Sequence, residues 1–89
     1  MADTEMIALT DTAWTEIAEA TNGYTTNEGT VPVKYVEAAV APLSLGIGHT
    51  LEASSMYRNI ANYRYSLNTG QKVFMHSISS AGLIAKTGD

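Results

Sequence analysis

The sequence predicts an all-β fold, a small antiparallel β-sandwich or barrel with at most one short helix. Three segments carry this prediction. Residues 31–40 are the clearest early strand, because Val31, Val33 and Tyr35 alternate against Lys34 and Pro32 fits a strand start or sheet edge. Residues 63–67 place tyrosine and leucine on one strand face and arginine and serine on the other. Residues 73–78 and 83–87 are apolar runs too short for stable helices, and the 79–82 connector has the length and chemistry of a hairpin turn.

The first third of the chain is ambiguous. Residues 6–9 are compatible with a short strand. Residues 11–20 fit a helix that Asp11 could cap and that the following Asn-Gly pair could end. They also fit a strand with Trp14 and Ala18 on one side. The local pattern slightly favours the helix, so the residues alone leave both alternatives open.

Glycine and asparagine residues predict where the chain turns between strands. Residues 24–30 are expected to form a turn, and residues 68–70 are expected to turn the chain into the C-terminal hairpin. Between these turns, residues 43–49 form an apolar loop with two glycines.

The C-terminal hairpin is predicted to be covered on both faces. Val73 and Met75 lie on one face of its first strand, and Phe74 and Ile78 lie on the other. A strand that is apolar on both faces is usually covered on both, as in a sandwich or at a subunit interface. We therefore expect a neighbouring chain to cover part of the hairpin. The interface candidates are Lys72, Val73, Phe74, Met75, Ile78, Leu83, Ile84, Lys86, Tyr57, Tyr63 and Tyr65.

An 89-residue chain is expected to form one domain, residues 1–89, with a marginal hydrophobic core. Disulfides, metals or association with other chains are the usual remedies for a marginal core. The chain has no cysteine, which excludes disulfides. The sequence also shows no cluster of metal ligands. Association with other chains is the remaining remedy, so the chain is predicted to form a homo-oligomer or to dock onto a larger body.

The formal net charge of −4 argues against non-specific binding to nucleic acid or to an anionic membrane. The charge is unevenly distributed: residues 1–52 hold eight acids and one base, and residues 53–89 hold four bases and one acid. Either strands from the two halves interleave in one domain, or the molecule is polar and docks against a complementary neighbour. In the second case Lys72 and Lys86 would meet the acidic half of an adjacent subunit.

The N-terminal residues are acidic and lack the features of a signal peptide, and no apolar run approaches the roughly 20 residues that span a bilayer. These observations predict a protein that is made in a cytosol and kept or assembled there.

The sequence contains no pattern typical of a catalytic or cofactor site. His49 and Glu52 stand three residues apart and His76 is distant, which falls short of the three or four ligands of a metal site. There is no Gly-x-Ser-x-Gly motif. Gly46 and Gly48 lack the third glycine of a dinucleotide fingerprint and instead predict a loop with unusual backbone angles. We expect no enzyme activity, no metal and no cofactor.

One aromatic and basic cluster covers residues 57–65. Nucleic-acid-binding sheets do stack bases on tyrosines beside arginines. Alternate tyrosines in a strand are more often packing or interface residues, however, and the acidic chain favours that interpretation. The predicted core anchors are Trp14, Ile17, Val33 and Tyr35.

Several short motifs together resemble a group of small structural proteins from the particles of tailed bacteriophages. They are the Trp-Thr-Glu-Ile motif at Trp14, the Glu-Ala-Ala-Val-Ala-Pro motif at Glu37, the Gly-His-Thr-Leu motif at Gly48 and the C-terminal stretch 71–87. The resemblance covers most of the chain, although the individual motifs are short and common. Residues 53–61 have no counterpart in the pattern.

The resemblance implies a small β-sandwich or barrel within a virion, with residues 11–20 as a strand, and we adopt that alternative. It implies a non-enzymatic capsid decoration (cement) protein that binds the major capsid protein or another virion protein, with a trimer favoured. A head-fibre or tail accessory, or a receptor-binding module of the virion, is the alternative role.

Overall fold

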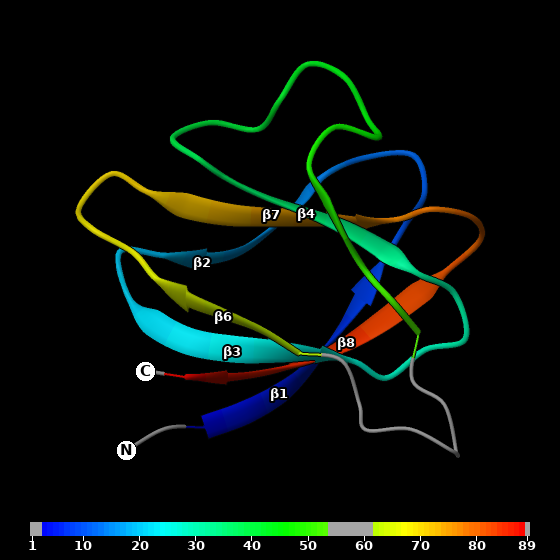
Figure 1. The fold of residues 1–89 in the computed structure, drawn as a ribbon, viewed down its shortest axis with the longest axis horizontal. Coiled ribbons are helices and arrows are strands. Elements are labelled where there is room, and N and C mark those ends of the chain that lie inside the picture. Colours follow the sequence, from blue (N-terminus) through cyan, green and yellow to red (C-terminus); the bar gives the residue numbers. More distant parts are fainter. Residues whose placement is uncertain (1–2, 54–61, 89) are drawn as a thin grey trace.

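The computed structural model describes residues 3–53 and 62–88, which form eight β-strands (Figure 1). The strands are β1 (Asp3–Leu9), β2 (Thr15–Glu19), β3 (Asn22–Asn27), β4 (Val33–Ala38), β5 (His49–Leu51), β6 (Asn62–Ser66), β7 (Lys72–Ser77) and β8 (Gly82–Gly88). No helix occurs in these two ranges, and none therefore that could cross a membrane.

The strands form two four-stranded sheets that pack face to face. Sheet A has the order β1-β8-β3-β6 and sheet B the order β2-β7-β4-β5, and every pairing is antiparallel. In Figure 1 the strands of sheet B lie above those of sheet A. The predicted all-β fold is confirmed, and the architecture is a small sandwich.

The ambiguous segment 11–20 contains strand β2, as adopted above. The turn predicted at residues 24–30 is wrong, because most of that segment belongs to β3. Two of its polar side chains, Thr25 and Asn27, are buried, and Asn27 donates from Nδ2 to the carbonyl oxygens of Val31 at 2.8 Å and Leu51 at 3.2 Å. A buried amide with such partners stabilises a strand that its polarity alone would not predict.

The predicted C-terminal hairpin is wrong. Strand β7 lies in sheet B and β8 lies in sheet A, so the two do not pair with each other. Their connector crosses between the sheets through Ser80, whose φ of 51° places it in the left-handed region. The Ser80 amide donates to the carboxylate of Asp11 at 3.2 Å, and Ser77 donates from its hydroxyl to the Ser80 carbonyl. This contact with a distant segment stabilises a crossover that local sequence does not distinguish from a hairpin turn.

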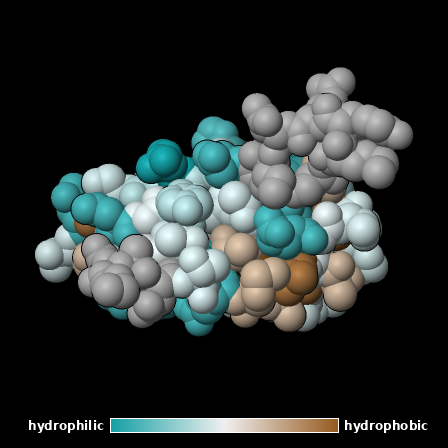
Figure 2. Space-filling model, turned by 90° about the horizontal axis from the view of Figure 1, so that it is seen from below, coloured by the Kyte–Doolittle hydropathy of each residue, from teal (hydrophilic) through white to brown (hydrophobic). Residues whose placement is uncertain are grey.

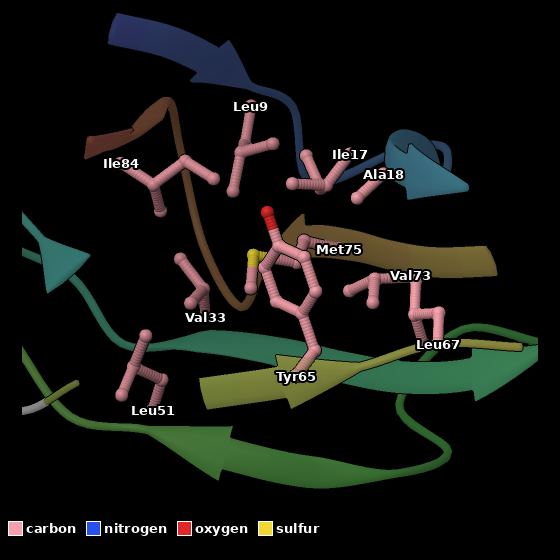
Figure 3. Close-up of a cluster of buried hydrophobic side chains, with 10 residues drawn as sticks. All are labelled: Leu9, Ile17, Ala18, Val33, Leu51, Tyr65, Leu67, Val73, Met75 and Ile84. Atoms are coloured by element: carbon pink, nitrogen blue, oxygen red, sulfur yellow. The ribbon is translucent and has the colours of Figure 1, made fainter. Parts of the chain in front are cut away.

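The inner faces of both sheets meet in one hydrophobic cluster (Figure 3). It contains ten buried side chains: Leu9, Ile17, Ala18, Val33, Leu51, Tyr65, Leu67, Val73, Met75 and Ile84. The predicted core residues Ile17 and Val33 are confirmed. Tyr35 is half-buried and packs against the cluster. The prediction of Trp14 as a core anchor is wrong, because it is half-buried outside the cluster and packs on His76.

Strand β7 is buried on both faces, as predicted, but not by a neighbouring chain. Val73 and Met75 on its inner face are fully buried in the core. Phe74 and His76 alternate with them, so they lie on the outer face of sheet B, and the chain's own residues bury both. Ile84 on β8 is also fully buried in the core. These four apolar residues, Val73, Phe74, Met75 and Ile84, are therefore wrong as interface candidates.

Candidate functional site

The connection between β4 and β5, residues 39–48, lies over the outer face of sheet B, and we call it the apolar loop. It is attached there at two points: Trp14 donates from Nε1 to the Ser44 carbonyl at 3.0 Å, and the Gly46 amide donates to Nε2 of His76 at 3.0 Å. The rings of Trp14 and His76 also pack edge to face, with 4.4 Å between their centroids. Two anchors to the sheet thus limit the movement of the loop.

The two glycines of the apolar loop confirm the predicted unusual backbone. Gly46 has a φ of 81° and Gly48 a φ of 110°. A Cβ atom at Gly48 would lie 2.4 Å from the carbonyl oxygen of Tyr35. Glycine is therefore required where the loop returns to the edge of sheet B as β5.

The apolar loop exposes large hydrophobic side chains although it is anchored. Leu43 is fully exposed, Val40 is 73% exposed, Ile47 51% and Leu45 41%. Four such side chains on one short connection leave apolar surface in contact with water, which is unfavourable in free energy. Such a concentration of large exposed apolar side chains on one connection of a small protein is typical of a place where another molecule binds.

A row of four aromatic rings closes the open edge between the sheets near β5 and β6. Tyr63 stacks on Tyr35 with 4.0 Å between centroids and lies 5.9 Å from Tyr65, and Tyr35 lies 5.5 Å from His49. The row runs from buried Tyr65 to exposed His49. Tyr65 is therefore wrong as an interface candidate, and Tyr63 is half-buried.

Two tyrosines of the row, Tyr63 and Tyr65, have raised pKa values. Burial, together with the hydrogen bond that Tyr63 donates to the Glu37 carboxylate, raises the pKa of Tyr63 well above its ordinary value. Burial, with a smaller contribution from the charge of Glu5, raises the pKa of Tyr65. The Tyr65 hydroxyl has no hydrogen-bond partner among the described residues.

A pocket of about 410 Å³ lies beside this row. Its lining residues are Tyr35, Val36, Glu37, Gly48, His49 and Tyr63. The ring faces of Tyr35 and Tyr63 are occupied by their aromatic neighbours, so they are not available to stack on a ligand. We interpret the row as packing that seals the edge of the sandwich.

A larger groove, of about 480 Å³, lies on the outer face of sheet A across β6, β3 and β8. Its lining residues are Asn22, Gly23, Tyr24, Arg64, Tyr65, Ser66, Thr87 and Gly88. Figure 2 shows the surface from the side on which sheet A lies, where hydrophilic and neutral residues cover most of the face and apolar residues gather in one patch. Met6 on β1 is 55% exposed.

The two lysines predicted to bind an adjacent subunit pair within the chain. Lys72 lies 3.3 Å from the Glu16 carboxylate, and Lys86 lies 3.7 Å from that of Glu5. Both acids belong to the acidic first half of the sequence, and strands from the two halves are neighbours in both sheets. The uneven charge distribution is therefore explained by interleaved strands, and the expected pairing with an adjacent subunit is not needed to neutralise either lysine.

The other interface candidates occupy different places. Ile78 is 46% exposed at the end of β7, and Leu83 is half-buried on β8. Tyr57 lies outside the described residues. The apolar loop was absent from the candidates, although its four large apolar side chains around two glycines were a readable signal of exposed apolar surface.

The two histidines considered as metal ligands lie in different parts of the structure. His76 is buried and holds the apolar loop, whereas His49 ends the aromatic row. Among the described residues, no three histidine, aspartate or glutamate side chains gather in a way that could hold a metal ion.

Comparison with known proteins gives no relative. No family model matches the chain, and neither the curated proteins nor the solved structures contain a match. A function is therefore proposed from the fold, the surfaces and the resemblance of the sequence motifs.

Proposed function

We propose that this protein is a non-enzymatic structural protein of a bacteriophage particle that docks onto the capsid shell through the apolar loop and stabilises it. The observation that carries the proposal is the combination of anchoring and exposure in that loop. Val40, Leu43 and Ile47 are exposed while Trp14 and His76 hold the loop against sheet B.

The physical argument concerns the cost of association. A loop that is already held in one conformation loses less conformational entropy on binding than a free one, so more of the hydrophobic gain remains as affinity. Burying the side chains of Leu43 and Val40 would contribute roughly 1.5–3 kcal/mol each. A protein of this kind requires an interface and no reactive group.

The choice of a capsid shell rests on the resemblance to small virion proteins described above. A homo-oligomer, with a trimer favoured, belongs to the same proposal. The buried residues of β7 and β8 no longer support it, so an oligomer would have to use exposed residues such as those of the apolar loop.

The test uses capsids stripped of their decoration protein. We expect the wild-type protein to bind them to saturation, with a stoichiometry fixed by shell symmetry. Leu43→Asp should weaken binding by at least about tenfold, because an aspartate in an apolar contact must lose its hydration. Met6→Asp is the matched control, since it adds the same charge at an exposed apolar position of sheet A, and it should bind as wild type.

Two results would contradict the proposal. If wild-type protein does not bind capsids and is found at the tail, the tail or fibre role replaces it. If Met6→Asp loses binding and Leu43→Asp does not, the docking surface is sheet A and not the apolar loop.

A further inference from the structure

The groove on the outer face of sheet A is built from two cross-strand rows of side chains. In one row Tyr24 of β3 lies between Arg64 of β6 and Thr87 of β8. In the next, Asn22 pairs with Ser66. Strand alternation directs these side chains away from the core, because Thr25 and Tyr65 next to them are buried inside it.

Arg64 supplies a positioned positive charge. Its guanidinium carbon lies 5.3 Å from the centroid of the Tyr24 ring, a cation–π contact that uses none of its N–H groups. Lys72 and Lys86 each pair with a glutamate, whereas in the described ranges 3–53 and 62–88 no carboxylate pairs with Arg64 or with Lys34 of β4. The planar N–H fork of a guanidinium matches the two oxygens of a carboxylate.

Neutral polar groups surround this cation. Ser66 donates to Oδ1 of Asn22 at 3.0 Å, which leaves the Asn22 amide able to donate from Nδ2. The Thr87 hydroxyl shares a hydrogen bond of 2.8 Å with Thr4 and keeps further bonding capacity. The described residues that line the groove include no aspartate or glutamate, so nothing among them repels an anion.

We propose that this groove binds an acidic sugar, with the carboxylate on the guanidinium of Arg64 and the ring hydroxyls on Asn22, Ser66 and Thr87. The volume of about 480 Å³ lies within the range of small-molecule sites. Arginine alone would select any carboxylate. The amide and hydroxyl groups around it select a ligand that carries hydroxyl groups beside its carboxylate. This site lies on a different surface from the apolar loop and does not depend on the function proposed above.

The test is a titration of the full chain followed by NMR, with glucuronate, acetate and glucose as probes. Glucuronate should shift the amide signals of residues 22–24, 64–66 and 87–88 in a saturable way. Acetate should bind more weakly, because it lacks the hydroxyl groups, and glucose should give no saturable shift. Arg64→Gln should weaken glucuronate binding by about tenfold or more, since it removes a charged hydrogen-bond partner.

Matched variants separate this site from other effects. Lys72→Gln removes one positive charge from sheet B and should bind glucuronate as wild type does. Arg64→Lys keeps the charge without the planar fork and should bind more weakly than wild type but more tightly than Arg64→Gln. Unchanged signals outside the groove show that each variant is folded.

Three results would overturn the proposal: no saturable shift with glucuronate, equal binding by wild type and Arg64→Gln, or acetate binding as tightly as glucuronate. Leu43→Asp should retain glucuronate binding whether or not it binds capsids. A failure of the sugar site is therefore distinguishable from a failure of the docking proposal.

Discussion

Sheet A and sheet B have the same number of strands and the same antiparallel pairing, but their outer faces differ. Part of the outer face of sheet B is covered by the apolar loop and Trp14, which both contact the buried His76. The outer face of sheet A carries an open polar groove. The difference shows that a ten-residue connection can take the place of a third layer. Burial on both faces of a strand is thus insufficient evidence for a subunit interface.

The largest effect is expected from removing residues 79–89. Strand β8 lies between β1 and β3, so its loss leaves both without their shared partner and opens sheet A. Sheet B, which keeps all of its strands, cannot cover its inner face alone. Far-UV circular dichroism should show the loss of the β spectrum, and urea titration should show no cooperative transition. A truncated chain that still unfolds cooperatively would mean that sheet B is stable without sheet A.

The attachment of the apolar loop to sheet B can be tested at His76 and Trp14. His76→Ala removes the acceptor of the Gly46 amide and a buried ring under Trp14, and should lower the free energy of unfolding by about 1–3 kcal/mol. Hydrogen exchange at the Gly46 amide should become faster. Trp14→Phe keeps an aromatic ring but loses the hydrogen bond to Ser44 and part of the ring contact, so a smaller loss of about 0.5–1.5 kcal/mol is expected. Unchanged exchange at Gly46 in His76→Ala would show that the loop is held by other contacts.

The aromatic row between the sheets predicts sensitivity to alkali. Because the pKa values of Tyr63 and Tyr65 are raised above the ordinary 10.0, the unfolded chain releases these phenolic protons at lower pH than the folded chain. The free energy of unfolding should therefore be insensitive to both groups below pH 10 and should fall as the pH rises above it. Urea titrations over this pH range measure the effect.

Tyr65→Phe is the corresponding variant. It keeps the ring and removes a buried hydroxyl that has no partner among the described residues, so it should be neutral or stabilising at pH 7 and less sensitive to alkali. A clear loss of stability at pH 7 would show that this hydroxyl does have a partner.

The smallest effect is expected from the two ion pairs, one in each sheet. The Lys72 and Lys86 pairs are partly exposed, so Lys72→Gln and Lys86→Gln should each cost about 0–1 kcal/mol and less at high salt. Thermal unfolding at low and high salt measures the difference. A loss of several kcal/mol for either variant would indicate a role beyond the pair.

Sequence alternation predicted a strand correctly where the apolar positions of the pattern are the buried ones in the structure. Tyr65 and Leu67 are buried and Arg64 is exposed, as their alternation requires. The errors occur where tertiary contacts decide. Nothing local distinguishes the Ser80 crossover from a hairpin, because the Asp11 carboxylate that binds its amide is remote in sequence. Asn27 looks like a turn residue until the carbonyl oxygens of Val31 and Leu51 are brought to it.

The candidate surfaces were less predictable than the strands. A hydrophobic residue in a sequence fits the core of the chain and a subunit interface equally well. Only the packing of β7 shows that Met75 belongs to the core. The groove depends on the register that places Tyr24 between Arg64 and Thr87, three residues from distant segments. Composition does not specify register, so the pairing of Arg64 with Tyr24 was not foreseeable.

The pairing of β1 with β8 has a consequence for the kinetics of folding. Glu5 lies opposite Lys86, so two segments that are far apart in the sequence must find each other before this pair of strands can form. Contacts of such large sequence separation must close a long loop before they contribute stability, and proteins dominated by them fold slowly. Until β8 is available, β1 and the neighbouring side of β3 have unpaired edges that can associate with other chains. We therefore expect refolding in milliseconds to seconds, with a yield that falls as the protein concentration rises.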